Sequence, residues 1–312
     1  MENFSKVKRR EFLKRSAMFA AGTMFLGFGG SKIYGAFKFT EFENAIPMVT
    51  LSNHIKMPML GFGTNTLMGP VCIQSVSDAI SVGYRLIDTA NIYGNEEFVG
   101  KGIMQSGMNR EALFITSKLW VDDAGYESTK KAFQTSLDKL GIDYLDLYLI
   151  HRPRGDVKGS WKAMEELYNE GKIRAIGVSN FDSNQLDDLM SYAAVKPVIN
   201  QIETNVFCQQ HSAYEYLKNA NIQMEAWSPF AAGRNEIFNN QTLKEIGEKH
   251  QKSVAQVCLR WLFQRGIVSI PRSSQKIHMI ENLNIFDFEL SETDLKKIRA
   301  LDLNTTQFPE WE

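Results

Sequence analysis

The stretch YRLIDTANIYGNEE, residues 84–97, combines the pattern of a buried strand with two polar side chains that can take part in catalysis. Its apolar pair at residues 86–87 suits a buried strand, and Asp88 stands at the end of that strand. Tyr93 follows five residues later, in a turn closed by the Gly-Asn pair at 94–95. An α/β barrel carries its active site just beyond the carboxyl ends of its strands, so this carboxylate and this phenol indicate such a fold.

Two further apolar runs also end in a polar residue. LFITSK ends at Lys118, and YLDLYLIH ends at His151. Together with Asp88 and Tyr93 they place a carboxylate, a phenol, an ammonium and an imidazole on three expected strand ends. Groups of these types exchange or stabilise protons, so we predict that the fold brings the four into one site.

Strand-like and helical patterns alternate along most of the chain. A β-hairpin is expected first, with Ser52-Asn53-His54 as its turn between two short apolar runs. A long helical region at residues 241–264 is interrupted near Gln251, and a last helix is expected at 292–301. Eight strands separated by helices are expected at residues 60–63, 86–88, 113–117, 144–150, 175–179, 198–203, 223–227 and 267–270.

This alternation predicts the α/β fold class. Parallel βαβ units over this length, eight in number, close into a (β/α)8 TIM barrel, here with an N-terminal β-hairpin and a C-terminal helix plus tail. A doubly wound sheet is the alternative, and it is disfavoured because no GxGxxG motif opens a helix.

The composition restricts the class of function. With 312 residues, 44% of them hydrophobic, and a net charge of −1, the chain can bury a large core and has no basic excess typical of nucleic-acid binding. Its three cysteines show neither metal-ligand spacing nor an even-numbered disulfide framework, so we expect buried thiols. The five histidines are scattered, which argues against a metal-dependent hydrolase and predicts no metal site.

The N-terminus differs from the rest of the chain. KRREFLK at residues 8–14 precedes an uncharged, Gly-rich apolar segment at 16–31 that is too short for a stable membrane span. The segment resembles a bacterial twin-arginine export signal, which predicts a signal at residues 1–36 followed by one barrel domain at 37–312. The expected partner is the twin-arginine export machinery and the expected location the periplasm, or the cytoplasm if the signal is not used. A basic amphipathic cap on the barrel is the alternative.

From about residue 48 onward the chain resembles the aldo-keto reductase family, in its bacterial branch. The motifs that carry the resemblance occur in family order along the chain: GFGT at Gly61, DTANIYGNE at Asp88, SKLW at Ser117, LIHRP at Leu149, GKIRAIGVSNF at Gly171, NQIETN at Asn200, AWSPF at Ala226, IPRSS at Ile270 and ENLNIFDFEL at Glu281.

The resemblance implies that Tyr93 is the general acid, with Lys118, Asp88 and His151 around it. A free tyrosine has a pKa of about 10, and a neighbouring lysine ammonium is expected to lower that pKa. Asp88 would hold Lys118 charged, and His151 would bind the carbonyl oxygen with the phenol. Each of the four could alone cap a helix, pack or face solvent, but their coincidence in family order favours carbonyl reduction with hydride from a cofactor.

The resemblance also assigns a cofactor site for NADPH. It implies that Ser179, Asn180 and Gln201 bind the nicotinamide carboxamide and that Trp227, next to Ser228, stacks on the nicotinamide ring. The same resemblance places Arg272, Ser273 and His278 at the adenosine 2′-phosphate, and Glu281 and Asn282 at the adenine. Because His278 stands where the family has an arginine and is mostly neutral at pH 7, NADH is expected to be usable as well.

The substrate pocket is expected to include Trp120, Phe62 and His151, with walls from residues 231–240 and from the tail at 304–312. An apolar, aromatic mouth suits a small-molecule carbonyl substrate such as an aldehyde, a ketoaldehyde or a small ketone. The alternative is a nucleotide-binding regulatory partner protein on the same barrel, with little turnover.

Overall fold

The computed structural model describes residues 46–311. The expected export signal and its boundary at residue 36 lie outside this range. Within it, the chain begins with the expected hairpin, in which β1 (Met48–Thr50) pairs antiparallel with β2 (Lys56–Pro58). The turn contains His54, which has a positive φ of 68°.

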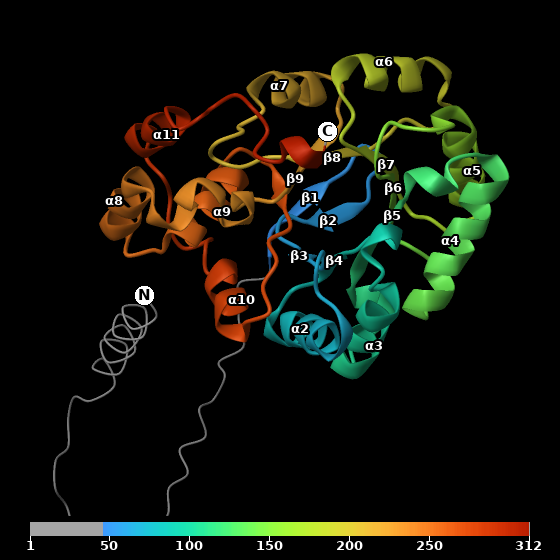
Figure 1. The fold of residues 1–312 in the computed structure, drawn as a ribbon, viewed down its shortest axis with the longest axis horizontal. Helices are drawn as coiled ribbons and strands as arrows, with labels where there is room; N and C mark the ends of the chain where they lie inside the picture. The colour runs from blue at the N-terminus through green and yellow to red at the C-terminus, as the bar shows by residue number, and fades with distance from the viewer. Residues whose placement is uncertain (1–45, 312) are drawn as a thin grey trace, which may run out of the picture. The chain divides into compact units, whose positions relative to one another are not determined.

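The hairpin is followed by an eight-stranded parallel barrel, which confirms the expected fold (Figure 1). Neighbouring strands follow the order of the sequence, from β3 to β10. The strands are β3 (Phe62–Gly63), β4 (Leu86–Asp88), β5 (Phe114–Leu119), β6 (Leu147–Ile150), β7 (Ile176–Ser179), β8 (Ile199–Glu203), β9 (Gln223–Trp227) and β10 (Val268–Ser269). The barrel closes between the first and last strands, where the Gly61 N–H donates to Ser269 O at 2.8 Å and the Gly63 N–H to Pro271 O at 3.0 Å.

Helices surround the strands, as Figure 1 shows. They are α2 (Gly69–Val82), α3 (Glu96–Ser106), α4 (Tyr126–Leu140), α5 (Val157–Asn169), α6 (Ser183–Tyr192), α7 (His211–Asn219), α8 (Gln241–His250), α9 (Val254–Gln264), α10 (Lys276–Leu283) and α11 (Glu292–Arg299). Short 3-10 helices occupy some of the loops: η2 (Asn91–Tyr93), η3 (Arg110–Ala112), η4 (Val121–Asp123), η5 (Ala231–Asn239) and η6 (Pro309–Trp311).

Local sequence explains several helix boundaries. Capping boxes start α6 at Asp182, α9 at Ser253 and α11 at Ser291, because each side chain accepts a hydrogen bond from an otherwise unpaired N–H of the first turn. The expected break near Gln251 is confirmed: Gln251 ends α8 in the left-handed region, with φ 55°. None of the helices among residues 46–311 combines the length and the apolar character that crossing a bilayer requires.

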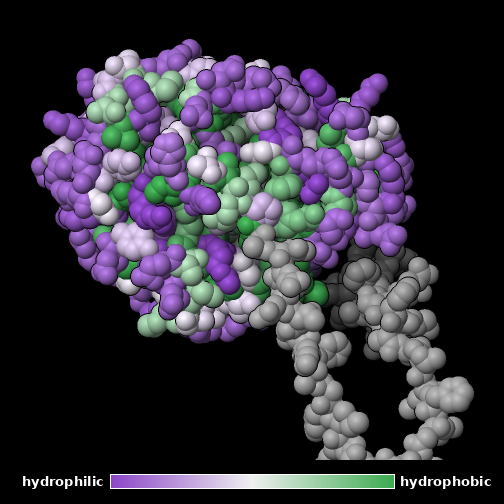
Figure 2. Space-filling view, turned by 180° about the vertical axis from the view of Figure 1, so that it is seen from behind, coloured by the Kyte–Doolittle hydropathy of each residue, from purple (hydrophilic) through white to green (hydrophobic). Residues whose placement is uncertain are grey.

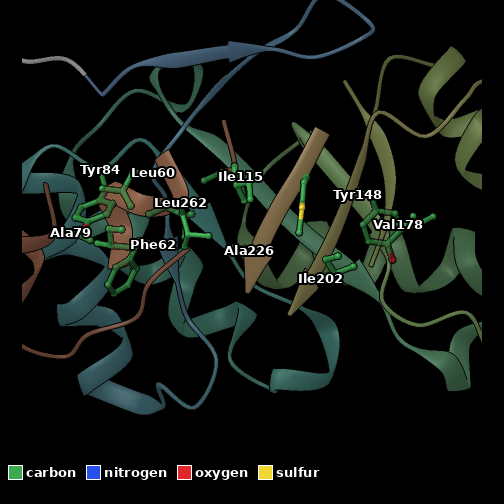
Figure 3. Close-up of a cluster of buried hydrophobic side chains, with 14 of the residues drawn as sticks. Leu60, Phe62, Ala79, Tyr84, Ile115, Tyr148, Val178, Ile202, Ala226 and Leu262 are labelled. Atoms are coloured by element: carbon green, nitrogen blue, oxygen red, sulfur yellow. The ribbon is translucent and has the colours of Figure 1, made fainter. Parts of the chain in front are cut away.

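The hydrophobic core has two layers because successive strand residues point to opposite faces. Ile87 and Tyr148 face outward into the layer between strands and helices, part of which Figure 3 shows. Leu86 and Leu149 belong to the second cluster, inside the barrel, where the hairpin residues Leu51 and Met57 pack against them. The three cysteines are buried, as expected. In the view of Figure 2, hydrophilic residues dominate the periphery.

Candidate active site

The carboxyl ends of the strands open into a cavity of about 870 Å³. A volume of this size is in the range that proteins use for small-molecule and cofactor binding. The residues that line it come from loops after most of the strands, and they include Thr64, Asp88, Tyr93, Trp120, His151, Arg152, Arg154, Ser179, Asn180, Gln201, Trp227, Ser228, Arg234, Arg272, Phe308, Glu310 and Trp311.

Asp88 and Lys118 form a fully buried ion pair at the bottom of this cavity. The Lys118 Nζ atom lies 2.5 Å from Asp88 Oδ1 and also donates to Thr89 O at 3.0 Å. Burial disfavours the charge of Lys118, but the attractions of Asp88, Tyr93 and Glu225 together outweigh it, so the pKa of Lys118 is raised. The ammonium is therefore charged at neutral pH.

Tyr93 ends η2 and directs its hydroxyl toward this pair. Lys118 Nζ lies 3.5 Å from the Tyr93 oxygen and 5.1 Å from the centre of its ring. Burial raises the pKa of the Tyr93 phenol, and the charge of Lys118 offsets that rise only in part. The expected net decrease in this pKa is therefore wrong, because desolvation of the phenolate exceeds its attraction to the ammonium. The phenol keeps its proton at neutral pH and is an acid.

His151 lies beside Tyr93, with 5.7 Å between ring centres and the rings nearly perpendicular. The ring of Trp120 also packs against His151, with 5.2 Å between ring centres. Burial, followed by the charges of Lys118 and Arg152, holds the pKa of His151 well below its usual value, so the imidazole is neutral. Its Nδ1 atom is buried without a partner among the described residues. A buried nitrogen that lacks a hydrogen-bond donor is tolerated better than a buried N–H that lacks an acceptor. This favours the His151 tautomer with the proton on Nε2.

Asn95 holds the turn that carries Tyr93. Its side-chain amide donates to Thr64 O at 2.8 Å and to Leu67 O at 2.9 Å, and its Oδ1 accepts from Thr89 Oγ1 at 2.9 Å. Gly94 precedes it with φ 65°, a left-handed conformation that glycine adopts without strain. The Gly-Asn turn was apparent from the sequence, whereas these hydrogen bonds of Asn95 were not.

Glu225 was missed by the sequence analysis. It lies in β9, and Gln201 Nε2 donates at 2.9 Å both to Glu225 Oε2 and to Asp88 Oδ2. Burial and the nearby charge of Asp88 raise the pKa of Glu225 to about 8. A carboxyl group within the apolar run QMEAW was the available signal, since a buried acid in a central strand needs a specific partner.

Asn180 ties together three expected cofactor residues. Its amide nitrogen donates to Ser179 Oγ and to His151 O, both at 3.0 Å, while its Oδ1 accepts from Trp227 Nε1 at 2.9 Å. Ser179 Oγ in turn donates to Gln201 O at 2.7 Å. Hydrogen bonds thus connect Ser179, Asn180, Gln201 and Trp227. These four and Ser228, the residues that the family resemblance assigns to the nicotinamide end of the coenzyme, all line the cavity.

The remaining expected cofactor residues are divided between the cavity and α10. Arg272 lines the cavity, whereas Ser273, His278, Glu281 and Asn282 do not. Ser273 accepts from the Gln275 N–H at 3.0 Å, His278 is exposed on α10, Glu281 is half-buried and Asn282 is buried. Ser273 precedes α10, and the other three residues lie on that helix, outside the cavity itself.

Phe62 does not line the cavity, so its expected role as a substrate contact is wrong. Its ring is buried in the layer between strands and helices, 5.8 Å from the ring of Tyr84, and Figure 3 shows it beside Ala79 and Tyr84. The cause is strand alternation: Phe62 faces outward, and the neighbouring Gly63 and Thr64 reach the mouth instead. Trp120, by contrast, lines the cavity as expected.

The C-terminal tail forms another wall. Phe308 and Trp311 lie 5.1 and 5.4 Å from Trp227, ring centre to ring centre. Glu203 anchors the tail by accepting from Thr306 Oγ1 at 2.5 Å and from the Gln307 N–H at 2.9 Å. Arg234 in η5 adds an ion pair with Glu310. Both expected walls of the pocket, η5 and the tail, are thus brought to the cavity.

The described geometry supports a specific kind of chemistry. A protonated phenol and a neutral imidazole line the cavity side by side, and a buried ammonium lies next to the phenol. Donors arranged in this way stabilise and protonate an oxygen on which negative charge develops.

Comparisons with known proteins agree with this geometry. The model of the aldo/keto reductase family matches residues 59–303. The glyoxal reductase of Bacillus subtilis (strain 168) is 52% identical over 256 residues, which cover 81% of this chain and 92% of that protein.

Solved structures give the same result. An aldo-keto reductase from a deep-sea metagenome library of the Medee basin is 44% identical, with a TM-score of 0.81 over 82% of this chain and 96% of that chain. The aldo-keto reductase of Bombyx mori in complex with NADP is 34% identical, with a TM-score of 0.79 over 85% of this chain and 95% of that chain.

Proposed function

Because this chain belongs to the aldo/keto reductase family, we propose that it reduces small aldehydes and ketoaldehydes to alcohols with NADPH, and that NADH also serves. The observation that carries the proposal is that Asp88, Tyr93 and His151 line one cavity, with Lys118 buried beneath it against Asp88 and Tyr93. Glyoxal reduction by a 52% identical relative supports a small dicarbonyl as substrate.

A reduced nicotinamide, when bound, supplies the hydride that the carbonyl carbon takes up, since no side chain can donate one. Tyr93 gives its phenolic proton to the carbonyl oxygen, and the neutral His151 donates a hydrogen bond to the same oxygen. Lys118 stabilises the phenolate that remains, and Asp88 keeps Lys118 charged and in place. A proton from solvent then restores the phenol, so the net change is one hydride and one proton added to the carbonyl.

The cavity fits a nicotinamide coenzyme. Gln201 donates both amide protons to buried carboxyl groups, and its Oε1 accepts no hydrogen bond within residues 46–311. This oxygen is free to accept from the carboxamide N–H, beside Ser179 and Asn180, and Trp227 offers a ring surface for stacking. The relative solved with NADP supports this assignment.

The far end of the coenzyme is proposed to lie along α10 and the residues that precede it. There Arg272 and Ser273 would hold the 2′-phosphate with help from His278, and Glu281 and Asn282 would face the adenine. Arg272 is the one permanently charged group proposed for the 2′-phosphate, where the family has two. Weaker binding of that phosphate is the reason for proposing that NADH, which lacks it, also serves. Fluorescence titration of tryptophan with NADPH and NADH measures this directly: NADPH is expected to bind more tightly, and much tighter binding of NADH would contradict it.

The substitution Tyr93→Phe tests the reaction. It is expected to lower kcat for glyoxal or 4-nitrobenzaldehyde by about 10²- to 10⁴-fold, the usual contribution of a general acid. The dissociation constant of NADPH should change little, because the phenol does not contact the adenosine half. A variant with full activity would refute the role of Tyr93. A wild-type protein that binds coenzyme but reduces no carbonyl compound would instead support a regulatory nucleotide-binding role.

We also propose that residues 1–36 direct export to the periplasm through the twin-arginine machinery, on the basis of the KRREFLK motif. Fractionation of cells that carry Arg9→Lys together with Arg10→Lys tests this. The double variant is expected to remain in the cytoplasm, and an unchanged distribution would contradict the proposal.

A further inference from the structure

Two arginines enter the cavity immediately after His151. Arg152 and Arg154 both line it, on the same loop between β6 and α5. Within residues 46–311, neither guanidinium has a carboxylate oxygen within 4.0 Å or a side-chain hydrogen bond. Arg234, a third arginine of the cavity, is in contrast paired with Glu310. Arg152 and Arg154 thus carry positive charge that the described part of the protein leaves unneutralised.

The two arginines lie close enough to affect each other. Burial, followed by the charge of Arg154, lowers the pKa of Arg152. Arg152 also acts on the site itself, because its charge contributes to the lowered pKa of His151 and partly offsets the raised pKa of Tyr93. Two like charges in a partly desolvated cavity repel each other, and an anionic ligand relieves that repulsion.

The loop that presents the pair is held in place. The Asn180 amide donates to His151 O at 3.0 Å, and the Arg154 N–H donates to Arg152 O at 2.8 Å. Gly155 follows with φ 76°, and a Cβ at this position would lie 2.7 Å from the Ala124 side chain. The loop therefore packs closely against the segment that follows η4, which keeps the arginines at the cavity.

The pair lies on the opposite side of the mouth from Arg272. Arg152 follows β6 and Arg272 follows β10, and these strands are four positions apart in an eight-stranded barrel. Arg272 stands where the coenzyme phosphate is proposed to bind. Arg152 and Arg154 share their side of the cavity with Trp120 and His151, next to the acid that protonates the substrate.

We propose that Arg152 and Arg154 form a subsite for an anionic group of the substrate, so that the enzyme prefers carbonyl compounds that also carry a carboxylate or a phosphate. A guanidinium group binds either a carboxylate or a phosphate through paired charge-assisted hydrogen bonds. This inference rests on the proposed carbonyl reduction and specifies its substrate class.

A matched pair of aldehydes tests the subsite. 4-Carboxybenzaldehyde and 4-nitrobenzaldehyde have similar shapes, but only the first is anionic, and 4-formylphenyl phosphate extends the comparison to phosphate. Wild-type enzyme, Arg152→Gln, Arg154→Gln and the double variant are assayed for kcat/KM with each aldehyde. The ratio of anionic to neutral kcat/KM is expected to fall about 10- to 100-fold in the double variant, the effect of losing hydrogen bonds to a charged group. Because this ratio is compared between the wild type and each variant, the different intrinsic reactivities of the aldehydes cancel.

Two control variants test whether the effect is specific to the cavity and to the guanidinium group. Lys158→Gln removes an exposed cation from α5 that does not line the cavity, and it should leave the ratio unchanged. Arg152→Lys keeps the positive charge but loses the planar set of N–H donors, so it should give an anionic-to-neutral ratio between those of the wild type and Arg152→Gln. The preference of the wild type for the anionic aldehydes should also weaken as salt is raised. The anionic aldehyde whose ratio falls more in the double variant identifies carboxylate or phosphate as the favoured group.

The outcomes separate this inference from the proposed function. Turnover of 4-nitrobenzaldehyde with an unchanged ratio in the double variant would overturn the anion subsite and leave carbonyl reduction intact. Failure of the wild type to reduce any of the aldehydes would overturn the proposed function. In that case calorimetry with benzoate still decides the subsite: loss of benzoate binding in the double variant supports it, and equal or absent binding to both proteins refutes it.

Discussion

At the scale of single residues, the site is organised by buried charge. Asp88 and Glu225 lie on either side of the Gln201 amide, and Lys118 supplies the single ammonium next to Asp88. Two ionised carboxylates in this space would carry one charge more than Lys118 can balance. The raised pKa of Glu225, about 8, keeps that carboxyl protonated at neutral pH and removes the excess.

The substitution Glu225→Gln should therefore change how stability depends on pH. The pKa of Glu225 is about 8 in the folded protein against an ordinary glutamate value of 4.5, so the folded state holds a proton that the unfolded state releases. Stability from this group is fully present below pH 4.5 and is lost as the pH rises toward 8, by up to about 1.4 kcal/mol per pH unit. Glutamine cannot ionise, so the variant should lose less stability over this range.

Urea denaturation of both proteins between pH 5 and pH 9 measures the difference. Glu248→Gln, at an exposed position of α8, is the matched control and should follow the wild type. Parallel pH profiles for wild type and Glu225→Gln would show that Glu225 does not retain its proton.

At the scale of elements, caps and ion pairs decide where helices begin and how they attach. Asp294 illustrates both functions: it accepts from the Ser291 N–H at 3.0 Å at the start of α11 and binds Lys249 at 2.8 Å and His250 at 2.9 Å on α8. Burial opposes its charge, but these hydrogen bonds outweigh burial and lower the pKa of Asp294. One carboxylate thus both caps a helix and joins it to its neighbour.

Asp294→Asn should lower the free energy of unfolding by about 1–3 kcal/mol at pH 7, the sum of a lost cap and a weakened charge pair. Because the folded pKa of Asp294 is depressed, this stabilisation is present above the ordinary aspartate value of 3.8 and is lost as the pH falls through and below it. The difference in the free energy of unfolding between Asp294→Asn and the wild type should therefore become smaller below about pH 4.

Asp287→Asn is the control for this prediction, since Asp287 pairs with Lys252 but is half-exposed. It should cost about 0–1 kcal/mol. Thermal unfolding monitored by circular dichroism compares the two variants. Neither residue lines the cavity, so kcat should stay at the wild-type value in both; an equal effect of the two substitutions on stability would contradict the role given to Asp294.

At the scale of the whole barrel, closure between β3 and β10 completes the site. Gly63 pairs with Asp88 in β4 and donates to Pro271 O next to Arg272, so it connects the catalytic side of the mouth with the coenzyme side. A Cβ on Gly63 would lie 2.8 Å from Ile270 O, a backbone atom that cannot rotate away. Glycine is required here by close approach of two backbones.

Gly63→Ala should therefore reduce both stability and activity. Overpacking at the closure is expected to cost about 1–3 kcal/mol, and the displaced strands should lower kcat/KM. Gly171→Ala is the control: its φ of 74° makes a side chain strained, but no atom lies within 4 Å of the added Cβ. It should cost about 1–2 kcal/mol and leave kcat/KM unchanged. A Gly63 variant with wild-type kcat/KM would refute this account of the closure.

Local patterns in the sequence determined much of this protein. Apolar runs that alternate with amphipathic helices predicted the eight strands and their order. A strand buried on both faces gives a continuous apolar run, whereas a helix buried on one face gives apolar residues every three or four positions. Asp88, Tyr93, Lys118 and His151 could be chosen because parallel strands end at the same edge of a sheet. The break of the helical region at Gln251 also followed from the local pattern.

Only the tertiary structure decided the features that depend on contacts between distant segments or on burial. Gln201 meets Asp88 across 113 residues of sequence, and Glu225 joins them from another strand, which no local period reveals. The outward direction of Phe62 followed from the register of a two-residue strand. The raised pKa of Tyr93 came from desolvation, which exists only once the cavity has formed. Sequence specifies which groups are present and in what order, whereas packing sets their distances and their exposure to water, and electrostatic energies depend on both.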